Sequence, residues 1–127
     1  MTGRADQNHL IADAQRAVGA PERAVPLAQE ALEADVAPEV RAEAALVGAS
    51  ALADLGRFEE ALALLGSVDR AGASVGPHHL RVWYVRADIL ERAGRRREAV
   101  RELRRIVRHD PQAYDAADRL SALSDQS

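Results

Sequence analysis

Few residues of this chain are arranged for metal or bond-making chemistry. The four histidines are His9, His78, His79 and His109, and cysteine is absent. The adjacent pair His78 and His79 resembles a metal site only superficially, because neighbouring side chains point in different directions on a helix and no carboxylate lies at i+3 or i+4 of either. No Gly-rich phosphate loop and no supported Ser/His/Asp arrangement occurs. We therefore expect no metal, no cofactor and no catalytic activity.

Arginine shows the strongest local concentration. Residues 81–108 hold ten of the seventeen Arg and only four acidic residues, and lysine is absent. Five of these arginines recur at helical spacing on one segment: Arg97, Arg101, Arg104, Arg105 and Arg108. Phosphate binding needs clustered positive charge, so a surface for anions or nucleic acid is one alternative. A solvated helix face is favoured over it, because no aromatic residues are interleaved and Glu98 and Glu102 can form ion pairs along the helix.

The overall composition is that of a folded domain. The chain has 127 residues, of which 47% are apolar and 29% charged, enough for one domain or one short repeat array. Aromatic residues make up only 3%, which predicts an aliphatic, Ala-rich core. The formal net charge of −3 provides no general attraction to nucleic acid or anionic membranes. No apolar run is long enough for a signal peptide or a membrane span, so we expect a cytoplasmic protein without a membrane partner.

Apolar residues recur at i, i+3 and i+4 almost throughout, and no segment alternates with period two. Glycine and proline separate the apolar stripes. The pattern predicts an all-α fold with helices near 5–18, 22–35, 39–55, 58–68, 78–93, 96–109 and 112–123. Pro26 conflicts with a regular helix that begins at Pro21, so we expect either a start nearer Ala24 or a kink.

A Gly followed five residues later by an Ala occurs three times, at intervals of 37 and 38 residues. The pairs are Gly19 and Ala24, Gly56 and Ala61, and Gly94 and Ala99. A period of this size is typical of stacked helical hairpins. The third copy is the most complete. Its first helix has a large residue, Trp83, and a small residue, Ala87, and Gly94 follows at the turn. Its second helix has the small residue Ala99 and is ended by Pro111.

In these positions the chain resembles the tetratricopeptide repeat family. The second copy shares the turn segment GRFEEA at 56–61, and the first shares small residues only. The resemblance implies one domain over 1–127, with repeats at about 5–38, 42–79 and 80–113 and a capping helix at 112–123. It also implies that the three hairpins form a right-handed superhelix. The chain is similar as well to the C-terminal part of actinobacterial proteins of this family, most clearly over 56–65 and 81–94.

The same resemblance implies a concave groove lined by the first helix of each hairpin. Transferring the groove positions of the family gives a set of ten residues: Asp6, His9, Asp13, Glu43, Leu46, Ser50, Arg81, Tyr84, Asp88 and Arg92. Some family members hold a terminal carboxylate with Lys and Asn at these positions. Here the positions carry mainly acidic, small and apolar residues, so we expect a partner with basic and apolar side chains.

The sequence therefore predicts a non-catalytic protein-interaction module, an adaptor or scaffold that binds a peptide or helix in its groove. Two alternatives remain open. A homo-oligomeric structural module would cover an apolar edge left by the weakly matching first repeat. An anion or nucleic-acid binder would use the Arg-rich third repeat instead, although nucleic acid is not the favoured partner.

Overall fold

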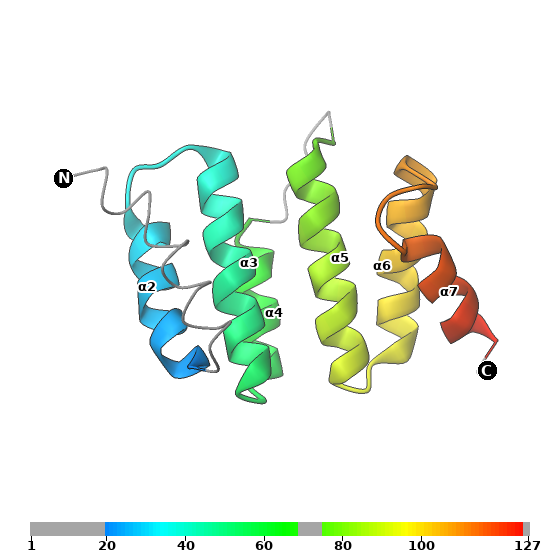
Figure 1. The fold of residues 1–127 in the computed structure, drawn as a ribbon, viewed down its shortest axis with the longest axis horizontal. Helices are drawn as coiled ribbons and strands as arrows, with labels where there is room; N and C mark the ends of the chain where they lie inside the picture. The colour runs from blue at the N-terminus through cyan, green and yellow to red at the C-terminus, as the bar shows by residue number, and fades with distance from the viewer. Residues whose placement is uncertain (1–19, 69–74, 126–127) are drawn as a thin grey trace. The chain divides into compact units, whose positions relative to one another are not determined.

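The computed structural model describes residues 20–68 and 75–125, and every regular element in these two ranges is an α-helix (Figure 1). The helices are α2 (Pro21–Glu33), α3 (Pro38–Asp54), α4 (Phe58–Gly66), α5 (Pro77–Arg92), α6 (Arg96–His109) and α7 (Ala116–Ser124). The chain divides into two compact units, residues 1–70 and 71–127. The predicted all-α fold is confirmed. The helix predicted at 5–18 lies outside the described residues, and the superhelical twist stays a prediction.

Two of the three repeated glycines can be assigned a conformational role. Gly56 and Gly94 lie between the helices of a pair and have φ angles of +77° and +79°, where a side chain would be strained. In both turns the N–H of the next residue bonds back across the glycine to the preceding helix: Arg57 to Leu52 at 2.9 Å, and Arg95 to Leu90 at 2.8 Å. The glycine therefore ends the first helix and reverses the chain in one step.

Proline marks the start of three helices and also lies inside one of them. Pro21, Pro38 and Pro77 each stand at the first position, where the missing N–H costs nothing. The helix α2 begins at Pro21 and continues through Pro26, so a start nearer Ala24 was wrong. Pro26 is exposed. Its ring removes the hydrogen bond that the Glu22 carbonyl would accept in an unbroken helix, and solvent can replace it on this face.

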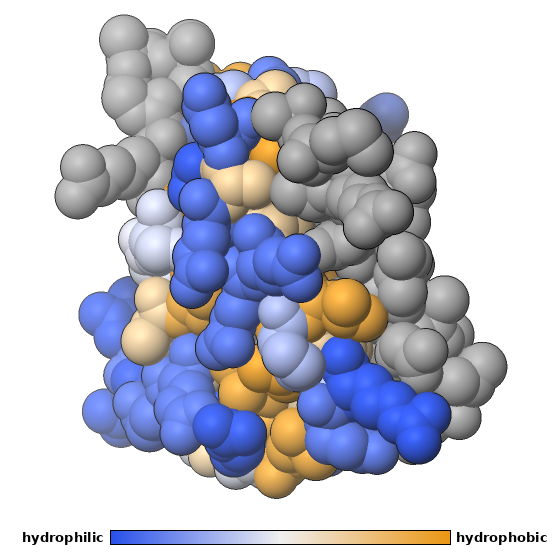
Figure 2. Space-filling model, turned by 90° about the vertical axis from the view of Figure 1, so that its left-hand side faces the viewer, coloured by the Kyte–Doolittle hydropathy of each residue, from blue (hydrophilic) through white to orange (hydrophobic). Residues whose placement is uncertain are grey.

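The first unit packs α2 against α3 and α3 against α4 through small side chains. Ala24, Ala28 and Ala31 on α2 are fully buried. A side chain on Gly48 of α3 would lie 3.1 Å from the Ala28 Cβ, so the glycine allows the two helices to approach closely. The outward side of α2 is polar, and the view from this side in Figure 2 is largely hydrophilic with apolar residues between.

Hydrogen bonds from Arg41 connect α3 to the C-terminal end of α2. Its guanidinium donates hydrogen bonds to the carbonyl oxygens of Leu32 at 2.7 Å and Ala34 at 3.3 Å. Carbonyls at a helix C-terminus lack helical donors and carry partial negative charge, so a cation there satisfies both needs. One side chain thus closes the end of α2 and orients α3 beside it.

The second unit packs α5 against α6 and α6 against α7. Trp83 of α5, the large residue of the third repeat, is 1% exposed and lies in the core. Its ring lies against two residues of α6: the Arg105 guanidinium carbon is 3.7 Å from the ring centroid, and the His109 ring centroid is 5.3 Å away. Arg105, which the sequence places in the charged stripe, therefore covers the largest core side chain instead of projecting freely.

The last helix starts later than predicted. It begins at Ala116 rather than at residue 112, and residues 111–115 form turns. The Asp110 side chain accepts a hydrogen bond from the Gln112 N–H at 3.0 Å, which favours a turn after Pro111. Tyr114 then has a positive φ of 52°, which no right-handed helix accommodates. Residues 111–115 form a loop that brings Tyr114 and Asp115 toward α5.

Candidate functional site

The ten predicted groove residues are distributed unevenly in the structure. Asp6, His9 and Asp13 lie outside the described residues. Glu43, Leu46 and Ser50 lie on α3 in the first unit, and the other four lie on α5 in the second. Leu46 is only 3% exposed, which favours a role in packing over a ligand contact. The most accessible part of the predicted set is therefore on α5.

Ion pairs connect one face of α5 to α7. Arg119 of α7 forms ion pairs with Glu91 and with Asp88, the latter at 3.5 Å. Arg92 adds a second cation 3.9 Å from the other Asp88 oxygen. Asp88 and Arg92, both predicted to contact a ligand, thus already neutralise charge within the unit.

Arg119 remains a cation throughout the accessible pH range. Burial acts to lower the pKa of its guanidinium, but hydrogen bonds to Tyr84 and Glu91 outweigh this effect and raise the pKa above its ordinary value. The charge that joins α7 to α5 is therefore permanent.

Tyr84 lies beside this charge cluster and pairs with Tyr114. The two ring centroids are 4.7 Å apart and the ring planes are inclined by 33°, so the rings are in tilted contact. The Tyr84 hydroxyl donates a hydrogen bond to the Asp115 carboxylate, and the Arg119 guanidinium carbon lies 5.4 Å from the Tyr84 centroid. We call Tyr84 and Tyr114 the tyrosine pair.

Tyr114 combines exposure with an unusual backbone conformation. The residue is 52% exposed, and its backbone has a left-handed conformation that is rare for a large residue. Such conformations cost of order 1–3 kcal/mol and collect at functional sites. Tyr114 therefore combines an exposed ring with a strained backbone conformation.

Sequence reasoning identified Tyr84 but missed Tyr114, Asp115 and Arg119. All three fall within the capping helix predicted at 112–123. They contact residues 28–35 positions earlier in the chain, and no short-range spacing encodes such contacts. The turn signal at Asp110 and Pro111 was the only available indication that the chain turns again before α7.

The hydrogen bond from the Tyr84 hydroxyl to Asp115 depends on pH. Burial raises its pKa above the ordinary value of 10.0, the Asp115 hydrogen bond raises it further, and Arg119 opposes both. Because the folded-state pKa is raised, the stabilisation is complete below the unfolded-state value of about 10 and is lost as pH rises through the folded-state value.

Wild type and Tyr84→Phe should therefore differ in stability below pH ~10 and converge above it. Denaturation curves and tyrosinate absorbance would measure this; two tyrosines that titrate at the ordinary value would contradict it.

Of the two adjacent histidines, His79 has a structural role. The His79 Nδ1 accepts a hydrogen bond from the Gly76 N–H at 2.8 Å, which caps the start of α5. The His78 ring lies 4.0 Å from that of His79. Within the part of the chain that the structure describes, no three His, Asp or Glu side chains gather as a metal site, and no helix is long and apolar enough to cross a membrane.

The glutamates of α6 pair with only some of its neighbouring arginines. Glu98 contacts Arg95 at 2.6 Å. Glu102 lies 3.9 Å from Arg86 of α5 and 3.8 Å from Arg105. The expectation that these two glutamates pair with the stripe along the helix therefore holds for Arg105 alone among its five members.

Comparison with known proteins agrees with this architecture. The family model described as Tetratrico peptide repeat matches residues 9–119, which is most of the chain. No protein with a curated description matches the chain.

Proposed function

Because the chain belongs to the tetratricopeptide repeat family, whose members are generally protein–protein interaction modules, we propose that it is a non-catalytic adaptor or scaffold whose main contact is the tyrosine pair. A peptide or helix of a partner protein would lie against the face of α5 and the turn that precedes α7. The half-exposed Tyr114 ring, stacked on Tyr84, carries this proposal. Buried aromatic anchors dominate the energy of many protein interfaces.

The chemistry of this face favours an apolar side chain from the partner. Asp88 and Glu91 are already paired with Arg119, so a basic residue of the partner would have to compete with an internal cation. About half of Tyr114 is exposed and can contact an apolar side chain, so we expect the apolar component of the partner to contribute more than the basic one. Charges at the rim are expected to affect mainly the association rate and its salt dependence.

Crosslinking at Tyr114 tests whether this face is occupied. A photoreactive phenylalanine analogue at position 114, expressed in the source cells, should capture a partner protein identifiable by mass spectrometry. The same analogue at Gln29, exposed on α2, is the matched control. Capture of one protein at 114 and not at 29 supports the site, whereas equal capture at both positions contradicts it.

Substitution then measures the contribution of the exposed ring. Tyr114→Asn removes the ring and introduces a residue that tolerates positive φ, so the fold should persist. Binding of the captured partner should weaken at least about tenfold. Tyr84→Phe is the control: it loses the Asp115 hydrogen bond, which should cost about 1 kcal/mol of stability, but retains the ring and should bind within about twofold of wild type. Titration calorimetry would measure both affinities, and the reverse ranking would exclude the tyrosine pair as the anchor.

The homo-oligomeric alternative stays a prediction. Size-exclusion chromatography with light scattering distinguishes it directly, since the adaptor is expected to elute as a monomer of 13.7 kDa in the absence of a partner.

A further inference from the structure

We propose that the outer face of α6 is a second docking site, which binds an acidic peptide segment of a partner protein. The site consists of four arginines, here called the outer stripe, and an adjoining hollow between α6 and α7. The outer stripe is formed by Arg97, Arg101, Arg104 and Arg108, at intervals of four, three and four residues. These intervals place all four on one face over about 16 Å of helix.

The outer stripe carries charge that no residue among those described neutralises. None of its four guanidinium groups forms an ion pair with any residue that the structure describes. The two glutamates of α6 are engaged with Arg95, Arg86 and Arg105 instead. Like charges four residues apart destabilise a helix by roughly 0.2–0.5 kcal/mol per pair. An anionic partner would remove this repulsion between the arginines and thereby stabilise the helix.

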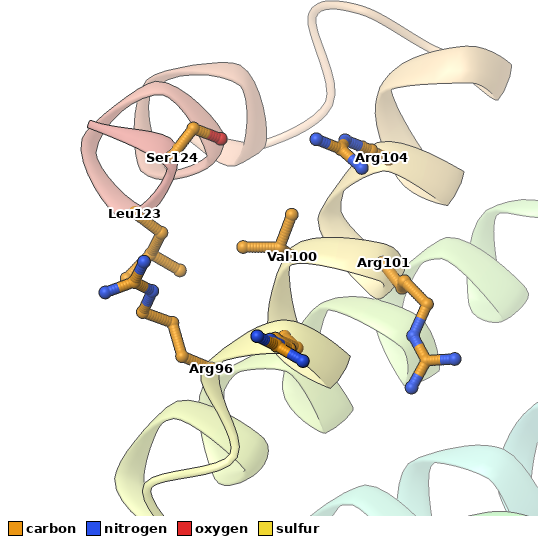
Figure 3. Close-up of a pocket in the computed structure, with 7 residues that line it drawn as sticks. Arg96, Val100, Arg101, Arg104, Leu123 and Ser124 are labelled. Carbon is orange, nitrogen blue, oxygen red and sulfur yellow. The ribbon is translucent and has the colours of Figure 1, made fainter. Parts of the chain in front are cut away.

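The hollow beside the stripe supplies an apolar contact. Its volume is about 940 Å³, and Val100 projects into it between α6 and α7 (Figure 3). Leu123 of α7 lines the opposite side, and Arg96, Arg97 and Arg104 surround it. Arg101 points away from Leu123 and also lines a smaller hollow of about 400 Å³ on the other side of the stripe. A ligand along the stripe would therefore meet cations along its length and one apolar wall.

An acidic peptide fits these features better than a nucleic acid does. The guanidinium fork matches a carboxylate in a two-point hydrogen bond. Glu residues at i, i+4 and i+7 of an incoming helix repeat the spacing of Arg97, Arg101 and Arg104, and a Leu beside them would reach Val100. Single-stranded nucleic acid would need aromatic platforms for its bases, and the stripe and the larger hollow contain none.

Fluorescence anisotropy with a defined probe tests this site. The probe is a labelled helical peptide of about 15 residues with Glu at i, i+4 and i+7 and Leu between them, at about 150 mM salt. A peptide with Gln for Glu and a single-stranded DNA of about 20 nucleotides are measured alongside it. The acidic peptide should bind at least about tenfold more tightly than either comparison ligand. Failure to bind, equal binding of the Gln peptide, or equal binding of the DNA would each overturn the proposal.

Matched variants locate the contact. Arg101→Gln with Arg104→Gln should weaken binding of the peptide at least about tenfold. Arg23→Gln with Arg57→Gln removes the same charge from the first unit and should leave the affinity within about twofold of wild type. Val100→Thr, which keeps the shape but adds a hydroxyl, should weaken binding about fourfold without changing charge. If both double variants lost affinity for the peptide equally, net charge alone would explain the binding, and the proposed site would be refuted.

Stability and assembly give two further readouts. If the stripe is under repulsive strain, the Arg101/Arg104 double variant should unfold at the same or higher urea concentration than wild type, so lost binding cannot be ascribed to unfolding. Tyr114→Asn should leave the affinity of the probe unchanged, which separates this site from the tyrosine pair. A doubled mass by light scattering that returns to the monomer value in the Arg101/Arg104 variant would identify a second copy of this chain as the occupant and overturn the proposal.

Discussion

Replacement of Trp83 by Ala should lower the free energy of unfolding of the second unit by about 3–5 kcal/mol. Trp83 is 1% exposed and is the largest fully buried side chain among the described residues. Its removal leaves a cavity between α5 and α6 and also uncovers the Arg105 stem and the His109 ring that lie against it. Urea denaturation followed by circular dichroism would measure the change.

A graded pair of variants isolates the volume effect. Trp83→Phe retains most of the apolar contact and should cost clearly less than Trp83→Ala. Arg105→Gln retains the indole but removes the cation above it, so the loss is expected to be about 1 kcal/mol. Emission of the single tryptophan should be that of a buried indole in the folded protein. A cost below about 1 kcal/mol for Trp83→Ala, or emission typical of an indole in water, would contradict this packing.

Gly48→Val should destabilise the first unit by about 1–3 kcal/mol. A Cβ at position 48 would lie 2.9 Å from the Leu64 Cδ2 and 3.1 Å from the Ala28 Cβ. The Leu64 side chain can rotate, but the Ala28 Cβ is fixed to the backbone of α2. The two helices must therefore separate, and the further methyl groups of Val increase that displacement. Even the higher helix propensity of other residues over Gly, worth up to about 1 kcal/mol, does not offset this cost.

Gly66→Val is the matched control for this substitution. Gly66 ends α4, and an added Cβ would meet no atom within 4 Å. The same change in residue type should therefore alter stability by less than about 0.5 kcal/mol. Thermal melting curves of the two variants would be compared at one protein concentration. Equal destabilisation at both positions would mean that backbone effects, not the close approach of α2 and α3, decide the outcome.

The sequence by itself determined the local conformations of this protein. Gly56 and Gly94 were recognisable as turns because a left-handed residue is a property of one position and its immediate neighbours. The positions of the helices followed from apolar periodicity in the same way, and five of the six described helices begin within one residue of their predicted starts. The burial of Trp83 followed from its size and its place in the repeat.

Tertiary structure decided which side chains meet. The tyrosine pair and the Arg119 contacts join residues 28–35 positions apart, and the turn before α7 contains a positive φ at Tyr114 that its own residue type does not favour. The arginines of α6 look alike in the sequence, since all but Arg108 have a glutamate within three residues. Packing against α5 selected Arg105 to cover Trp83 and directed Glu102 toward Arg86, while no described residue forms an ion pair with the outer stripe. Helical spacing offers each charged side chain several partners of similar energy, so only the neighbouring helix, through the side chains it buries, selects among them.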